Sequence, residues 1–148
     1  MPVLGRRLGQ RYRRRSRGQS LVEFAMVLPI FMLVLSGILD FGVLLYSRMT
    51  VINAAREGAR AAIMVSDPTT IDTVAQGAAI ASAAGGGLTV STVRTKCYVG
   101  TSTTSTPCAS AVTGDSVSVE VDYTYTTFFP LAFGASFPLS STVQMVME

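Results

Sequence analysis

Histidine and tryptophan are both absent from this chain of 148 residues, and only 14% of its residues are charged. The lack of histidine excludes His-based catalytic triads, histidine metal ligands and the usual side chain for proton transfer near neutral pH. An ordinary soluble domain has about a quarter of its residues charged, whereas 49% of the residues here are hydrophobic. The composition therefore weakens most enzyme hypotheses and predicts that part of the protein lies in a membrane.

The net charge of +3 is unevenly distributed along the chain. From residue 19 onward, five basic residues are set against nine acidic ones, so this portion carries 5 minus 9, or a charge of −4. Clustered arginines can bind nucleic acid, but next to a hydrophobic segment we interpret them as a topology signal and expect no nucleic-acid partner. The basic residues of the leader are Arg6, Arg7, Arg11, Arg13, Arg14, Arg15 and Arg17.

A long hydrophobic run, residues 21–46, follows these arginines. Its uncharged centre, Phe24–Leu39, would form about 24 Å of helix, and extension to Tyr46 covers a bilayer core of about 30 Å. Because the arginine excess precedes the run, the positive-inside rule places the N-terminus in the cytoplasm. We predict a cytoplasmic leader at 1–18, a helix spanning the inner (cytoplasmic) membrane at 19–46, and an extracytoplasmic domain at 47–148.

Polar residues within this run are functional candidates, because charges inside a membrane are costly unless they are paired. Ser36 and Asp40 are four residues apart and can share one helix face. Asp40 is expected either to face a protein partner or to reach the outer headgroups of the lipid bilayer. A cleaved signal peptide is disfavoured, because residues 35–37 fit a small-x-small cleavage site poorly.

The segment RGQSLVEF, residues 17–24, places a glycine after basic residues and a glutamate at the start of the hydrophobic helix. This pattern resembles the processing site of type IV prepilins and pseudopilins. The resemblance implies that a prepilin peptidase cuts after Gly18, so that Gln19 becomes the new N-terminus and Glu23 the fifth mature residue. An α-amino group, with a pKa of about 7.7 to 8, is a cation that can neutralise a buried carboxylate.

The match extends beyond the cleavage site. QSLVEFAMVLP, then DFG, then NAAREGAR at these distances resemble the TadE-like pseudopilins of tight-adherence (Tad, Flp-type) pilus systems. One departure from the major Flp pilins is that Phe24 rather than tyrosine follows Glu23, and those pilins are also much shorter. The motif residues are Asn53, Arg56, Glu57, Gly58 and Arg60.

The TadE resemblance implies a minor component that acts in the assembly or initiation of a pilus used for adhesion, biofilm formation and secretion. Its implied partners are the prepilin peptidase, other pilins and pseudopilins, and the inner-membrane assembly platform. A permanently anchored, unprocessed extracytoplasmic binding module is the alternative, in which Gly18 is incidental.

The remainder of the chain predicts an α+β domain. The stem helix continues past the membrane with small or apolar residues at helical spacing from Val51 to Ile63, and a second helix spans 70–84 before a glycine triplet that we interpret as a hinge. Residues 88–95, 116–127 and 139–147 alternate with period two. We expect a three-stranded antiparallel sheet packed on the helical stem.

Cys97 and Cys108 bracket a Thr/Ser-rich loop in a compartment that the topology makes oxidising, and we predict a disulfide. Two thiols without histidine are a poor metal site, so no metal, cofactor or catalytic residue is proposed. Asp115, Glu120 and Asp122 are interpreted as surface charges rather than an acid/base pair. The apolar segment 128–138 could cap the core, lie on the outer membrane surface or contact a partner subunit.

Overall fold

The computed structural model describes residues 12–100, 102–130 and 134–148. Arg6, Arg7 and Arg11 of the leader, and Leu131 and Phe133 of the apolar segment, lie outside the described residues. The chain divides into two compact units, residues 1–39 and residues 40–148. Helix α1, Tyr12–Ile63, contributes to both.

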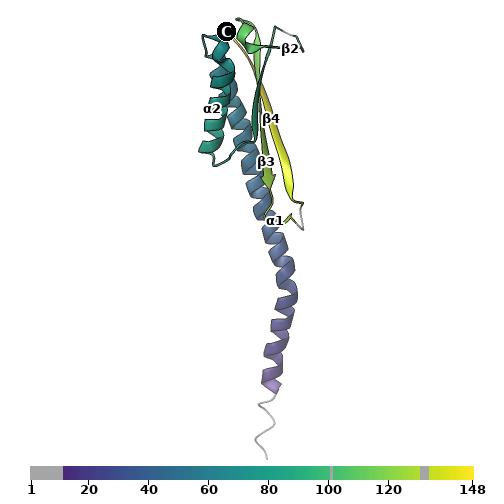
Figure 1. Ribbon diagram of the computed structural model, residues 1–148. Coiled ribbons are helices and arrows are strands. Elements are labelled where there is room, and N and C mark those ends of the chain that lie inside the picture. Colours follow the sequence, from purple (N-terminus) through teal and green to yellow (C-terminus); the bar gives the residue numbers. More distant parts are fainter. Residues whose placement is uncertain (1–11, 101, 131–133) are drawn as a thin grey trace, which may run out of the picture. The chain divides into compact units, whose positions relative to one another are not determined.

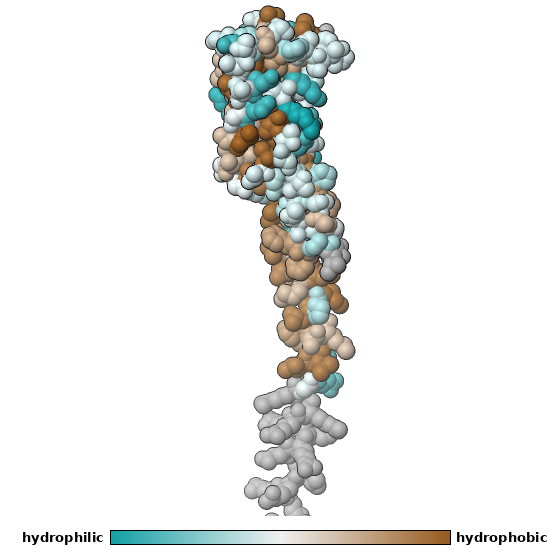
Figure 2. Space-filling model, viewed as in Figure 1, coloured by the Kyte–Doolittle hydropathy of each residue, from teal (hydrophilic) through white to brown (hydrophobic). Residues whose placement is uncertain are grey.

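In the first unit, α1 displays apolar side chains rather than burying them. Leu21, Phe24 and Ile30 are each more than 60% exposed, and Figure 2 shows brown, hydrophobic residues along this helix. Exposed apolar side chains on every side of a helix are typical of a segment that lies in lipid. By length and composition alone, α1 is able to cross a membrane.

The second unit contains the C-terminal part of α1, helix α2 (Ile71–Gly85) and one antiparallel sheet in the order β2-β1-β3-β4 (Figure 1). Short 3-10 turns, η1 (Pro68–Thr70) and η2 (Cys108–Ser110), lie in the connections. The architecture is α+β, as predicted. The strands are β1 (Thr92–Tyr98), β2 (Ser105–Thr106), β3 (Ser116–Thr126) and β4 (Ser136–Val146).

The sheet has four strands, so the prediction of three was wrong. The additional strand, β2, has two residues and pairs with Cys97 and Tyr98 of β1. A strand of this length has no period-two pattern to detect. It is formed within the Thr/Ser-rich loop that the two cysteines bracket.

The core of this unit is made of small residues. The predicted stripe on α1 is buried at Val51, with Ala54, Ala55, Ala59 and Ala62 completely inaccessible, and Ala75, Ala79 and Ala83 of α2 are equally buried. A Cβ added at Gly58 would lie 2.9 Å from the carbonyl oxygen of Ala75 and 3.1 Å from Cγ1 of Val119. Gly58 therefore lies at the point where α1 contacts both α2 and β3.

The glycine triplet ends α2, as its position after the second helix predicted. The amide of Leu88 donates to the carbonyl oxygen of Ala83, and Gly87 has φ +74°. These are features of a glycine-dependent helix C-cap. The hydroxyl of Tyr46 on α1 donates to the carbonyl oxygen of Gly86, which ties this cap to the stem helix.

Candidate functional site

The residues of the predicted processing site lie on α1. Gly18 has open space where a Cβ would be, and Glu23 and Phe24 are exposed. The side-chain amide of Gln19 donates to Oε1 of Glu23 over 3.3 Å, one helical turn away. The carboxylate of Glu23 thus bonds to a neutral side chain of its own helix, and it is exposed enough to bind a cationic group as well.

Asp40 has partners in the folded domain. Its Oδ1 accepts a 2.8 Å hydrogen bond from the hydroxyl of Tyr125 and a 2.9 Å hydrogen bond from the amide of Phe128. The residue is only 6% exposed. Its Oδ2 is buried and has no hydrogen-bond partner within the described part of the chain.

Asp40 was expected to face a protein partner or the lipid headgroups, whereas its partners are Tyr125 and Phe128 of the same chain, which the sequence did not indicate. The available signal was that Tyr125 lies on the apolar face of its strand, where a phenolic hydroxyl needs a partner. Ser36, predicted to share a face with Asp40, donates its hydroxyl to the carbonyl oxygen of Leu33 on its own helix. A serine hydroxyl within a helix commonly donates its hydrogen bond to a carbonyl oxygen of the preceding turn in this way.

The NAAREGAR motif divides between the core and the surface. Its alanines and Gly58 are buried, whereas its polar residues are exposed. The small residues explain the close packing of α1 on α2 and β3. The exposed polar residues of the motif are Asn53, Arg56, Glu57 and Arg60.

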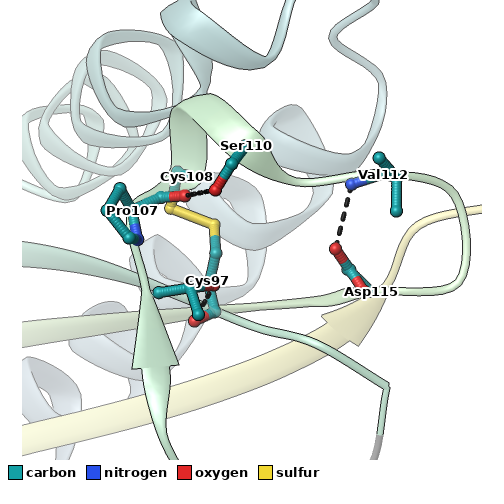
Figure 3. Close-up of a disulfide and its surroundings, with 7 residues drawn as sticks. Cys97, Pro107, Cys108, Ser110, Val112 and Asp115 are labelled. Carbon is teal, nitrogen blue, oxygen red and sulfur yellow. Dashed lines mark hydrogen bonds between the residues drawn. A yellow bond between two sulfur atoms is a disulfide. The ribbon is translucent and has the colours of Figure 1, made fainter.

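The predicted disulfide joins Cys97 at the end of β1 to Cys108 at the start of η2, with 5.1 Å between their Cα atoms (Figure 3). Close by in the same view, Asp115 accepts a 2.9 Å hydrogen bond from the amide of Val112. Its other oxygen accepts from the amide of Gly100 over 3.2 Å. Asp115 is therefore a buried loop-fixing residue, and its interpretation as a surface charge was wrong.

The other two carboxylates considered as an acid/base pair, Glu120 and Asp122, lie in ion pairs on the outer face of the sheet. Arg94 on β1 approaches Asp122 at 3.1 Å and Glu120 at 3.6 Å, and Lys96 lies 3.9 Å from Glu120. All four groups are partly solvated, so these pairs contribute little to stability. Within the described ranges, no group of three or more acidic or cysteine side chains could hold a metal ion.

These observations define a class of protein: a chain with one long helix able to cross a membrane, carrying a small α+β domain with a disulfide. A family model described as TadE-like protein matches residues 18–60. The resemblance to TadE-like proteins of Tad pilus systems is therefore confirmed over this segment, and the family is a structural one rather than an enzymatic one. No curated protein and no solved structure matches the chain.

Proposed function

We propose that this chain is a minor pseudopilin, matured by a prepilin peptidase after Gly18, that acts in the assembly or initiation of a Tad-type pilus. The observation that carries the proposal is the family match, which starts at Gly18, includes Glu23 and ends at Arg60, the last residue of the NAAREGAR motif. In this function the protein contributes to adhesion, biofilm formation and secretion through the pilus. It performs no catalysis of its own.

The proposal includes a topology, which the positive-inside rule supports. The arginine leader remains in the cytoplasm, the span lies within 19–46, and residues 47–148 are exported across the inner membrane. The disulfide between Cys97 and Cys108 fits this arrangement, because disulfides persist in oxidising compartments outside the cytoplasm.

Glu23 supplies the physical reason for processing. An isolated carboxylate in the apolar run costs several kcal/mol, on the order of what buried ions generally cost. Cleavage creates a cationic amine at Gln19, and the same amine on a neighbouring subunit can neutralise Glu23 during assembly. The charge pair then sets the axial register between subunits. Glycine is also the residue at which a helix opens at low cost, about 1 kcal/mol relative to alanine, which favours access of the peptidase to Gly18.

The test is the intact mass and N-terminal sequence of the membrane-purified protein, produced with and without its prepilin peptidase. The proposal expects a chain that begins at Gln19 only when the peptidase is present. Gly18→Arg should abolish the cleavage, and Gly9→Arg is the matched control because it makes the same change at another leader glycine. An unchanged mature mass in Gly18→Arg would refute the assigned site.

The alternative, an unprocessed anchored module, makes the opposite prediction for the same measurement. It expects the arginine leader to remain attached whether or not the peptidase is present. Its partners would then be ligands of the exported domain alone. A cut near Gly37 would contradict both proposals and indicate an ordinary secreted protein.

A further inference from the structure

The end of the β3–β4 hairpin is aromatic, exposed and free of charge. Phe128 and Phe129 follow β3 and are 69% and 52% exposed. Phe137, which pairs with Tyr125 across the hairpin, is 40% exposed. The sequence has no charged residue between Asp122 and Glu148. A group of exposed phenylalanines without charges is typical of an interaction surface.

Hydrogen bonds fix this aromatic end at one residue of α1. Both the hydroxyl of Tyr125 and the amide of Phe128 donate to Oδ1 of Asp40. Phe41, the next residue of α1, is 61% exposed. The contact of Asp40 with Tyr125 and Phe128 is called the Asp40 junction below. Of the three exposed phenylalanines, Phe128 is bonded to Asp40, Phe41 follows Asp40 in the sequence, and Phe129 follows Phe128.

Asp40 is also the residue at which the apolar run ends. The stretch from Phe24 to Leu39 is uncharged, and Asp40 follows it directly. Residues 21–39 form about 28 Å of helix, close to the hydrocarbon thickness of about 30 Å. In a helix that spans the bilayer with this run, Asp40 reaches the outer edge of the hydrocarbon core.

We propose that Phe128 and Phe129 insert into the outer membrane–water interface and hold the folded domain against the lipid surface. This inference rests on the membrane anchor of the proposed function. Aromatic and apolar side chains bind the boundary between headgroups and acyl chains. We choose lipid as the binding partner for two reasons. First, Phe128 is hydrogen-bonded to Asp40, the residue that directly follows the apolar run. Second, the end of the hairpin carries no charge that would disfavour insertion.

The Asp40 junction makes this arrangement physically consistent. A carboxylate at the edge of the hydrocarbon core is costly when it faces lipid. Here Oδ1 is turned toward two donors of the domain, and the whole residue is buried. The domain therefore shields the one acidic group at this level while it presents phenylalanines outward.

Because the chain contains no tryptophan, single tryptophans report on this surface without background. Phe129→Trp tests the proposed insertion, and Phe31→Trp, within the apolar run, tests the anchor itself. Val112→Trp is the matched domain control. Val112 is 63% exposed and lines a hollow with Ile63, which lies about 35 Å along α1 from Asp40.

Each full-length variant is reconstituted in vesicles of phosphatidylethanolamine and phosphatidylglycerol with brominated acyl chains, and its fluorescence quenching is measured. Insertion predicts strong quenching at positions 31 and 129 and none at 112. If position 31 is quenched while 129 behaves like 112, insertion is wrong and the anchor stands. Blue-shifted but unquenched emission at 129 would indicate a protein contact and also reject insertion.

Absence of quenching at all three positions would overturn the membrane anchor together with this inference. Circular dichroism checks that each variant is folded. If Phe129→Trp fails to fold, Phe128→Trp repeats the test at the neighbouring exposed side chain.

Discussion

The hydroxyl of Tyr125 donates a 2.8 Å hydrogen bond to Oδ1 of Asp40, a residue 85 positions earlier in the chain. The bond joins the last part of β3 to α1, and the amide of Phe128 adds a second donor to the same oxygen. Because β3 also pairs with β1 and β4, this carboxylate links the sheet to the stem helix in addition to the packing of β3 against Gly58.

Removing the hydroxyl should loosen this junction. Tyr125→Phe keeps the ring but deletes one hydrogen bond to a buried carboxylate, and we expect a loss of about 1.5–3 kcal/mol in the free energy of unfolding. The measurement is thermal or chemical unfolding of the full chain in detergent, followed by circular dichroism. Tyr123→Phe is the matched control, since Tyr123 lies on the same strand and its hydroxyl makes no hydrogen bond within the described residues. Equal effects of the two variants would contradict a specific role for the Asp40 contact.

The same tyrosine should make stability sensitive to alkaline pH. Burial, and then the hydrogen bond to Asp40, raise the pKa of Tyr125 to about 12, whereas an unfolded tyrosine titrates near about 10. Between these values the unfolded chain releases a proton that the folded chain retains, so stability is fully present below pH 10 and falls as the pH rises toward 12. Tyrosinate absorbance should show a step near pH 12 that is missing in Tyr125→Phe. A step that persists in that variant would assign it to another group.

The sequence predicted those features that depend on local pattern. The stripe from Val51 to Ala62 is buried as its helical spacing indicated, and Val117, Val119 and Val121 of β3 lie in the core as predicted. The opposite face of β3 was expected to be exposed, but Ser118 on that face is buried. The first predicted strand, 88–95, begins instead at Thr92. The reason is that Gly86, Gly87 and Leu88 complete the C-cap of α2 before the chain can extend.

Features that depend on tertiary placement were not predictable in this way. The residues around Asp40 and around Tyr125 form no sequence pattern that predicts their contact, because the contact exists only once the sheet lies on α1. Asp115 was misassigned for a similar reason, since its partners are the backbone amides of Gly100, within the loop closed by the disulfide, and of Val112, which follows that loop. The disulfide was predictable because the chain has only two cysteines, they bracket one short loop, and the expected compartment is oxidising.

Gly58 should not tolerate even a methyl group. An added Cβ would lie 2.9 Å from a backbone oxygen of α2 and 3.0 Å from Cβ of Ala79, so the two helices would have to separate. We expect Gly58→Ala to lower the free energy of unfolding by about 1–3 kcal/mol, the usual cost of overpacking. Gly77→Ala is the control within α2, where a Cβ meets nothing within 4 Å, and it should stabilise by up to about 1 kcal/mol. A stabilising Gly58→Ala would mean that the helices pack less closely than the structure shows.

Glu23 should be dispensable for cleavage but required for assembly. Glu23→Ala leaves Gly18 and the arginine leader intact, so the peptidase should still produce a chain that begins at Gln19. Without the carboxylate, a neighbouring amine has no counter-ion in the apolar run, and incorporation into pilin complexes should fall by at least about tenfold, equivalent to about 1.4 kcal/mol. The readouts are the mature mass and co-purification with the other pilins. Asp72→Ala is the control, because Asp72 is an exposed acid in the first turn of α2 and lies outside the matched segment. Normal co-purification and piliation of Glu23→Ala would contradict the assembly role, whereas loss of cleavage would assign Glu23 to peptidase recognition instead.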